Sequence, residues 1–556
     1  MWGAAQAYGS RSLVRRSPMV THPNASRDRA RLADVRLGTT IGLAGVALIA
    51  AAGLVVVTLS STSGAPAGAG SSRADRPSVV PAPLELDVLG GAPFTLSGGT
   101  PVLAEDPVLA DVAAAYAEAV RERTGLALPA DDGHARIRFA LDAALAPEEY
   151  RIEVRPTGIR VDAGDAAGAF WAVQTLLQLP APGDDENVPA VTVHDAPRFA
   201  YRAAMLDVAR HFFTVEDVER YLDRVASLKL NVLHLHLTDD QGWRIAISAH
   251  PQLAEIGGRY AVDSDPGGFY TQDDYRRIVA YAAERFITIV PEVDMPGHTN
   301  AALASLPQLN PGGKVAKPYT GIEVGFSTLD TASETTYAVI GDVLTELAAL
   351  TPGPYLHIGG DESHATDPAD YRAFVERTAR IAADTGKTVI GWHQLGQSDA
   401  LPPGTVGQYW GYVQPEPADA EEARSILAQG GRLIMSPADV AYLDMKYDFL
   451  TPRGLTWANG YTSIEDAYSW DPAAVVSGVA EDAILGVEAP IWTETLRTMD
   501  EVEEMAMPRL ATMAEVAWTP QAERDYAGFV PRLVRLAARW DAEGVRHLRP
   551  AGIPWA

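Results

Sequence analysis

The sequence of 556 residues contains no cysteine. A chain without cysteine has no disulfide, no thiolate nucleophile and no cysteine-ligated zinc or iron–sulfur cluster. Basic residues are also scarce, because 45 Lys and Arg face 72 Asp and Glu, which gives a net charge of −27. Nucleic-acid binding needs a basic footprint, so this charge balance argues against a nucleic-acid partner. A neutral or cationic substrate is compatible with it.

One long apolar run without charge spans residues 37–59. At about 1.5 Å of rise per residue, such a helix is long enough to cross a hydrocarbon core of about 30 Å. Residues 1–36 carry seven Arg and two Asp, a net charge of +5, so the rest of the chain carries −32. This asymmetry favours an orientation in which the basic arm stays in the cytoplasm and the rest of the chain is exported. We expect an uncleaved membrane anchor; the alternatives are a cleaved signal peptide, after which the body is secreted, and a buried core helix.

The next two segments differ in composition. Residues 60–80 are rich in Ser, Gly, Ala and Pro and predict a flexible linker. Residues 81–197 predict a small α+β companion domain, with a helix between Asp106 and Gly125 and alternating strand-like runs after it. No set of ionisable groups in this domain suggests catalysis, so we expect it to have a packing or positioning role.

From residue 198 to residue 556, short apolar runs alternate with helix-like stretches. This alternation is typical of a (β/α)8 barrel, in which residues at the carboxyl ends of the strands line the active site. The sequence therefore predicts an α/β fold: a TIM-barrel catalytic domain that follows the companion domain and the N-terminal transmembrane or signal segment. The eight runs are AAMLDVARH, NVLHLHLTDDQGW, ITIVPEVDMPGH, YLHIGGDE, TVIGWHQ, TVGQYWG, RLIMSPADVAYLD and ILGVEAPIWTE.

Acidic side chains follow several of these runs. Asp361 and Glu362 come after an apolar strand and two glycines. Two neighbouring acids raise the pKa of one of them, as a general acid near neutral pH requires; an acidic helix N-cap is the alternative. Asp239 follows a second run and His298 a third. A carboxylate and a histidine from neighbouring strand ends can form a dyad that tunes an adjacent acid, although each singly also fits a structural role.

Aromatic side chains gather near the same strand ends. Trp and Tyr side chains have flat apolar faces with a polar edge, which suit the C–H faces of a sugar. They therefore predict a sugar-binding site; ordinary core packing is the alternative. The residues are Trp392, Trp410, Tyr442, Trp457 and Trp492.

Together these segments resemble the family-20 glycoside hydrolases, the β-N-acetylhexosaminidases, over nearly the whole chain after the linker. The resemblance implies an exo-acting retaining enzyme that removes terminal non-reducing β-linked GlcNAc or GalNAc. In this family the substrate assists through an oxazolinium intermediate. The resemblance implies an oligosaccharide substrate, no cofactor and no metal, and it sets no oligomeric state. Its motifs are DVARHFF, LHLHLTDDQGWRI, PEVDMPGHTNAAL, YLHIGGDES, GWHQL, YWG, SPADVAYLDMKY and GVEAPIWTE, with EEYRIEV and GAFWAVQTLLQL in the companion domain.

The resemblance also implies catalytic roles. Glu362 would be the general acid and then the base that activates water. Asp361 would accept the acetamido N–H and stabilise the developing positive charge. Tyr442 would donate a hydrogen bond to the acetamido oxygen. Asp239 and His298 would form the dyad that supports Glu362.

The implied substrate-binding residues hold the sugar itself. Arg210 and Glu494 would grip O3, O4 and O6 and so select a terminal sugar. Asp444 would contact the outer hydroxyls. The walls of the acetamido pocket and the sugar face would be Trp392, Trp410, Trp457 and Trp492.

Two other classes of function stay open. His234 and His236 lie on one face of a barrel strand and, with His298 or His357, resemble the ligands of a metal-dependent hydrolase; buried hydrogen-bonded histidines are the alternative. The other class is a catalytically inactive, surface-attached sugar-binding protein, against which the intact Asp361–Glu362 pair argues.

Overall fold

The computed structural model describes residues 77–130 and 134–555. The basic arm expected at residues 1–36, the apolar segment 37–59 and most of the linker expected at 60–80 lie outside these residues. In the part of the chain that the structure describes, no helix is both long and apolar enough to span a bilayer.

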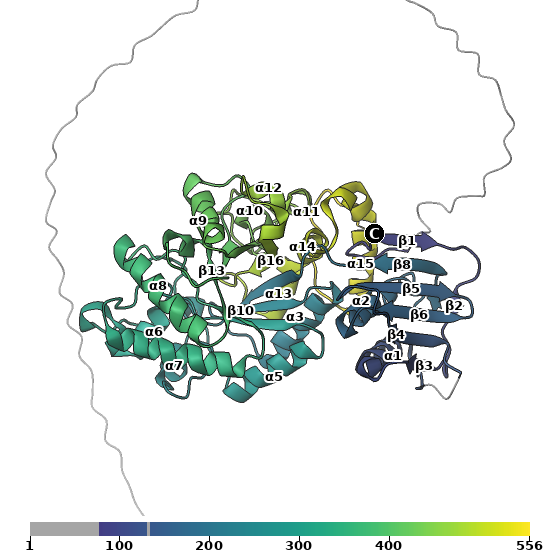
Figure 1. Cartoon of the computed structure of the whole chain (residues 1–556), viewed down its shortest axis with the longest axis horizontal. Coiled ribbons are helices and arrows are strands. Elements are labelled where there is room, and N and C mark those ends of the chain that lie inside the picture. Colours follow the sequence, from purple (N-terminus) through teal and green to yellow (C-terminus); the bar gives the residue numbers. More distant parts are fainter. Residues whose placement is uncertain (1–76, 131–133, 556) are drawn as a thin grey trace, which may run out of the picture. The chain divides into compact units, whose positions relative to one another are not determined.

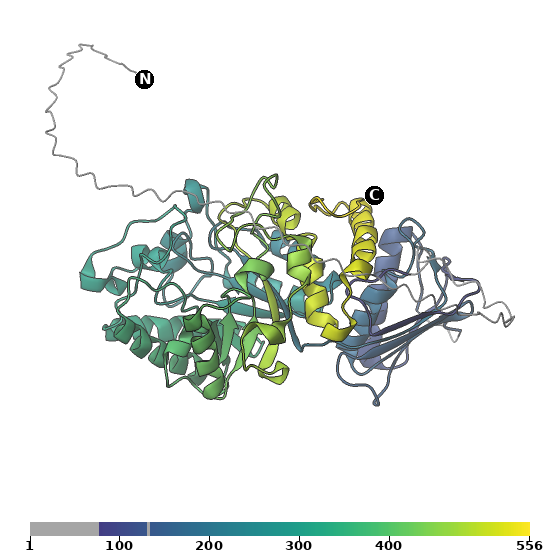
Figure 2. The same ribbon diagram turned by 90° about the horizontal axis from the view of Figure 1, so that it is seen from above.

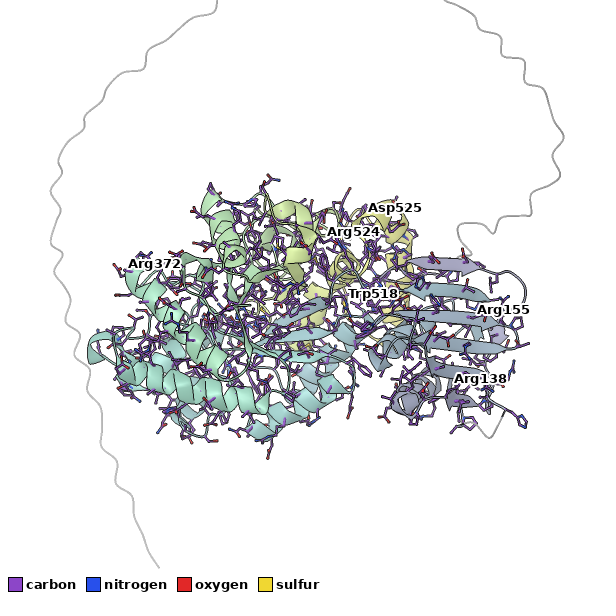
Figure 3. All side chains as sticks on the ribbon, in the orientation of Figure 1. Arg138, Arg155, Arg372, Trp518, Arg524 and Asp525 are labelled. Carbon is purple, nitrogen blue, oxygen red and sulfur yellow. The ribbon has the colours of Figure 1, made fainter. Side chains whose placement is uncertain are left out.

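The companion domain is built on a six-stranded sheet with the strand order β1-β8-β5-β6-β4-β3 (Figure 1). Side chains of β5 (Tyr150–Arg155) alternate between buried and exposed, so one face of the sheet is buried and the other is in solvent. Arg138 and Arg155 both lie on this sheet (Figure 3). The other strands are β1 (Glu85–Val88), β3 (Val102–Ala104), β4 (Ile137–Leu141), β6 (Gly158–Ala163) and β8 (Val191–Asp195), with a separate pair β2 (Phe94–Thr95) and β7 (Asn187–Val188).

Two helices, α1 (Ala110–Thr124) and α2 (Ala166–Leu176), pack on the sheet. The predicted helix between Asp106 and Gly125 begins as a 3-10 turn and ends at Gly125, whose φ of 75° lies in the left-handed region that favours glycine. Val79 and Val80 fall within the stretch expected to be a linker, yet both are buried. The backbone N–H of Val80 donates to the Gln178 side chain, so packing begins before residue 81.

Eight parallel strands close into a barrel in the order β10-β11-β12-β13-β14-β15-β16-β9, which confirms the predicted (β/α)8 fold. Each strand coincides with one of the eight apolar runs. Strands β10 and β16 are buried at every position, as expected when helices cover the outside and side chains fill the inside. The strands are β9 (Tyr201–Asp207), β10 (Val232–His236), β11 (Thr288–Glu292), β12 (Tyr355–His357), β13 (Thr388–Trp392), β14 (Val406–Tyr409), β15 (Arg432–Met435) and β16 (Ile484–Ile491).

One connection departs from the expected alternation. Between β13 and β14 the chain forms only a 3-10 turn at His393–Gln397. The rest of this connection contains Pro402, Pro403 and Gly404, which do not extend a helix.

The helices of this domain are α3 (Val215–Ser227), α4 (Gln252–Gly257), α5 (Gln272–Ala283), α6 (Asn300–Ser305), α7 (Glu334–Leu350), α8 (Pro368–Asp384), α9 (Pro417–Ala428), α10 (Ala438–Ala441), α11 (Ile464–Tyr468), α12 (Pro472–Val475), α13 (Met499–Ala506), α14 (Arg509–Trp518) and α15 (Tyr526–Glu543).

The C-terminal helix α15 lies beside the companion domain, although the two are far apart in sequence (Figures 1 and 2). Arg539 on this helix pairs with Asp185 at 2.8 Å and donates to the carbonyl of Pro180 at 2.6 Å. Lys229, just before the amino end of β10, bonds to Asp195 of the companion sheet at 2.9 Å. The companion domain therefore contacts the amino ends of barrel strands, opposite the polar carboxyl ends.

Candidate active site

A tight turn places the two neighbouring acids at the carboxyl end of β12. Gly359 and Gly360 have φ values of 65° and 110°, and Glu362 has a φ of 42°. A Cβ on Gly359 would lie 1.7 Å from Oδ1 of Asp294, so only glycine fits there. This turn explains why two glycines precede Asp361 and Glu362.

A cavity of about 320 Å³ opens at the carboxyl ends of the strands and brings most of the predicted residues together. Three of the residues predicted for the site lie outside its lining: Asp239, Trp392 and Asp444. Three lining residues were not predicted, and they are Ile322, Val324 and Leu455. The complete lining is Arg210, His298, Ile322, Val324, Asp361, Glu362, Trp410, Tyr442, Leu455, Trp457, Trp492 and Glu494.

His298 links the acids. Its Nδ1 lies 3.1 Å from Asp239 Oδ2, and its Nε2 lies 3.4 Å from Glu362 Oε2 and 3.7 Å from Asp361 Oδ2. Burial alone would lower the pKa of His298, but the charges of Asp239 and Asp361 outweigh it and hold this pKa well above its usual range. A cationic imidazole therefore stands beside both catalytic candidates.

The part of the site around Arg210 and Glu494 is charged, and several of its polar atoms have no hydrogen bond. Arg210 contacts Asp239 Oδ2 through Nη2 at 2.7 Å and lies over the Trp492 ring at 4.7 Å. Burial and the charge of Glu494 raise the pKa of Asp444 well above its usual range. Buried polar atoms without a hydrogen bond cost about 1–3 kcal/mol each, so their clustering is typical of a site that binds a ligand. They include Arg210 Nε and Nη1, His298 Nε2, Asp361 Oδ1, Asp444 Oδ2 and Glu494 Oε2.

Aromatic rings form the side walls. Trp457 is 46% exposed and lies 6.1 Å from Trp410 and 5.8 Å from Tyr442, measured between ring centroids. Trp492 lies 6.1 Å from Tyr442. Burial and the charge of Asp361 raise the pKa of Tyr442 well above its usual range, so its hydroxyl stays a neutral donor.

Trp392 lies just behind the lining of the cavity. This residue is completely buried, its indole N–H donates to Glu292 Oε1 at 3.0 Å, and its ring lies 5.9 Å from that of Trp492. It packs in one cluster with Tyr442 and Trp492, which line the cavity, so its role as a wall of the acetamido pocket stays a prediction. Asp444 and Asp239 are likewise buried just outside the lining and reach it through Trp492 and Arg210.

The unpredicted lining residues are apolar. Ile322 and Val324 lie in the long connection between β11 and β12 and are 49% and 39% exposed. An isolated aliphatic side chain in a loop has no chemical signature, and no periodic pattern places such a loop over a cavity. Their position follows only from the folded structure.

The histidines proposed as metal ligands are bonded to buried carboxylates. His234 Nδ1 lies 2.8 Å from Glu488 Oε1, and His357 Nδ1 lies 2.9 Å from Glu292 Oε1. His236 bonds to Glu292 through Nδ1 and to Asp239 through Nε2. His234, Glu292 and His357 lie close enough together to hold an ion, but none of the three lines the cavity. A metal held there would be out of contact with a substrate in the cavity.

Comparisons with known proteins agree with this architecture. A protein-family model described as glycosyl hydrolase family 20, catalytic domain, matches residues 199–370 and 364–521. A second family model, described as glycosyl hydrolase family 20, domain 2, matches residues 76–196. A β-N-acetylhexosaminidase of Cellulomonas fimi is 42% identical over 486 residues, which cover 86% of this chain and 97% of that protein.

Solved structures are similar over the same range. The N-acetyl-β-hexosaminidase of Streptomyces plicatus is 46% identical with a TM-score of 0.84, and the match covers 87% of this chain and all of that one. The family-20 β-N-acetylhexosaminidase of Streptomyces coelicolor is 46% identical with a TM-score of 0.83, covering 86% of this chain and all of that one. The chain belongs to glycosyl hydrolase family 20.

Proposed function

We propose that this protein is an exo-acting β-N-acetylhexosaminidase that hydrolyses terminal β-linked N-acetylhexosamine with retention and with assistance from the substrate. The observation that carries this proposal is the placement of both acids beside one histidine nitrogen, His298 Nε2. If both carboxylates lie on one side of the sugar, neither can attack the anomeric carbon from the opposite face. The 2-acetamido oxygen of the substrate then supplies the nucleophile.

Each acid has a separate task in this mechanism. Asp361 accepts the acetamido N–H, and Tyr442 donates to the acetamido oxygen; both side chains line the cavity. These two bonds aim the acetamido oxygen at the anomeric carbon and offset the positive charge of the oxazolinium ion. Glu362 protonates the leaving oxygen and then removes a proton from the attacking water, with His298 beside it.

The polar atoms without hydrogen bonds around Arg210 and Glu494 support recognition of a terminal sugar. Arg210 Nε and Nη1, Asp444 Oδ2 and Glu494 Oε2 provide buried donors and acceptors for hydroxyl groups. Arg210, Trp492 and Glu494 line the cavity, so a chain that continued beyond the sugar's non-reducing end would meet them. A related Streptomyces plicatus enzyme has been solved with GlcNAc as product, which agrees with a sugar of this kind here.

A thiazoline mimic of the bicyclic intermediate tests the proposal. A compound that resembles the transition state binds at least 10²-fold more tightly than substrate, so nanomolar to micromolar inhibition is expected against a p-nitrophenyl N-acetyl-β-glucosaminide substrate. Product analysis by NMR should show the β-anomer first. No inhibition at millimolar thiazoline, or an α-anomer as first product, would contradict substrate assistance.

Export of the catalytic domain is the second part of the proposal. Its support is the charge pattern of the sequence: a basic arm of +5, the uncharged run 37–59 and an acidic remainder of −32. We expect the chain to be membrane-anchored outside the cytoplasm, or secreted if the apolar run is cleaved. Membrane fractionation combined with N-terminal sequencing separates these two outcomes, and activity confined to the cytoplasm would contradict both.

A further inference from the structure

Asp294 is a buried carboxyl group at the catalytic turn that has no part in the mechanism above. It follows β11 and is 2% exposed. Its Oδ1 accepts the backbone N–H of Gly360 at 2.9 Å. Its carboxyl group also lies within 4.8 Å of that of Asp361, which places the two acids to share a hydrogen bond. The glycine at position 359 is required because Asp294 approaches the turn so closely.

Two carboxyl groups that hydrogen-bond to each other must hold a proton between them, because an ionised carboxylate has no hydrogen to donate. Burial and the charge of Asp361 raise the pKa of Asp294 well above its usual range. The imidazole of His298 lies 3.7 Å from Asp361 Oδ2, and its charge favours the ionised form of Asp361. The shared proton therefore belongs to Asp294, and Asp361 carries the negative charge.

We infer that Asp294 is a positioning residue: a neutral carboxylic acid whose O–H donates to Asp361, keeps it ionised and fixes its carboxylate for the acetamido N–H. This inference rests on the proposed function, because the acetamido group is what Asp361 receives. Asp361 Oδ1 is buried, while Oδ2 lies 3.7 Å from His298 Nε2. Asp361 lines the cavity, so its carboxylate can meet both Asp294 and a substrate.

The surrounding groups favour one proton on the pair rather than none. A second negative charge at Asp294 would lie beside Asp361 and near Glu292, and burial disfavours it further, which outweighs the opposing charges of His236 and His298. Losing the proton would also remove a side-chain donor beside Asp361. The titratable groups that face the pair are Glu292, His236, His298, Glu362, Tyr371 and Tyr442.

The test compares two substitutions by their pH–rate profiles on p-nitrophenyl N-acetyl-β-glucosaminide. Asp294→Asn keeps an N–H donor for Asp361 and an oxygen for Gly360, so kcat/KM should stay within about threefold of the wild type. Asp294→Ala removes the donor, so kcat/KM should fall by about tenfold to hundredfold. Because Asp361 must be ionised and a lost donor raises its pKa, the acid limb of the Ala variant should move to higher pH by about one unit.

A matched control is Asp240→Asn, which alters another buried acid of the same region. Asp240 accepts from the N–H of Asn300 at 2.9 Å and from the hydroxyl of Ser327 at 2.6 Å, and it does not bond to Asp361. This variant should leave the acid limb in place. An acid limb of Asp294→Ala at the wild-type pH, or equal losses in the Asn and Ala variants, would overturn the inference. An inactive wild-type chain would instead overturn the proposed function.

A direct measurement does not depend on the folding of the Ala variant. The infrared difference spectrum of wild type minus Asp294→Asn at pH 7 should show the carbonyl band of a protonated carboxylic acid. Other neutral acids, such as the Asp444 carboxyl, cancel in the difference. A difference spectrum with only a carboxylate band would overturn the inference.

Discussion

Two buried charge clusters lie at opposite ends of the same barrel strands, and they differ in how completely they are paired. The interface cluster consists of Lys229, Asp195, Tyr150 and Trp518. Lys229 Nζ donates to Asp195 at 2.9 Å and to Tyr150 at 2.8 Å, and the Trp518 indole donates to Asp195 at 2.9 Å. Tyr150 also donates to Asp195, and no polar atom of the cluster lacks a partner. Trp518 lies where the barrel meets the companion domain (Figure 3).

The cavity cluster consists of Arg210, Asp239, His298, Asp361 and Glu494. It contains more ionisable side chains, and Arg210, His298, Asp361 and Glu494 each keep at least one buried polar atom without a hydrogen bond. A network that is satisfied in the free protein stabilises the fold, whereas an unsatisfied network is preorganised for a ligand. Burial and charge alone do not distinguish a structural cluster from an active site. Side chains that line a cavity and keep polar atoms without hydrogen bonds do.

The largest effect should come from removing the general acid. Glu362→Gln keeps size and polarity but cannot protonate a leaving oxygen, so kcat on a chitobiose substrate should fall by about 10²–10⁴-fold. The loss should be much smaller on a dinitrophenyl glycoside, whose leaving group needs no proton. Equal losses on both substrates would contradict this role. The melting temperature should change little, because Glu362 is not part of a satisfied network.

The interface cluster should respond in the opposite way. Lys229→Met leaves Asp195 ionised and buried without its cation, which should lower the free energy of unfolding by roughly 3–5 kcal/mol. The kcat of the folded enzyme should stay the same, because the cluster is at the far end of the strands. Arg138→Met is the matched control, since Arg138 makes only an exposed pair with Glu105 at 3.2 Å. Exposed pairs of this kind contribute about 0–1 kcal/mol to the free energy of unfolding. Arg138→Met should therefore lower that free energy by no more than this amount, which denaturant titration can check.

Tyr442→Phe should have an intermediate effect on the cavity cluster. Loss of one hydrogen bond to the acetamido oxygen should reduce kcat by about tenfold to hundredfold, with a smaller change in KM. Steady-state kinetics on p-nitrophenyl N-acetyl-β-glucosaminide measures this split. A change confined to KM would mean that the hydroxyl binds the ground state only.

Chelation should have the smallest effect. The proposed reaction uses two carboxylates and the amide of the substrate, so exhaustive treatment with EDTA should leave kcat/KM within about twofold of its starting value. Loss of activity that added Zn²⁺ restores would favour the metal-dependent alternative, with Asp294, His298 and Asp361 as its candidate ligands, because two of them line the cavity.

The barrel could be predicted because each strand is a short apolar run followed by polar residues. Local spacing also placed Asp361 and Glu362 at a strand end, and the fold itself brought His298 and Asp239 beside them. The roles of these residues in catalysis stay predictions that the experiments above test.

Other features depend on packing between distant segments. The place of Trp392 behind the cavity lining, with Glu292 from another strand accepting its N–H, could not be predicted from local spacing. Lys229 and Asp195 belong to different domains, so no local pattern pairs them. The proton on Asp294 follows from the approach of a second carboxyl group in the folded turn. Sequence periodicity carries no record of such approaches.

Asp361→Asn on p-nitrophenyl N-acetyl-β-glucosaminide tests the central claim most directly. Asp361 acts before the leaving group needs a proton, so an activated substrate cannot rescue this variant. The account predicts a fall in kcat of about 10²–10³-fold, with an unchanged melting temperature and weaker thiazoline binding. A variant with near wild-type activity on this substrate would contradict substrate-assisted catalysis in the cavity.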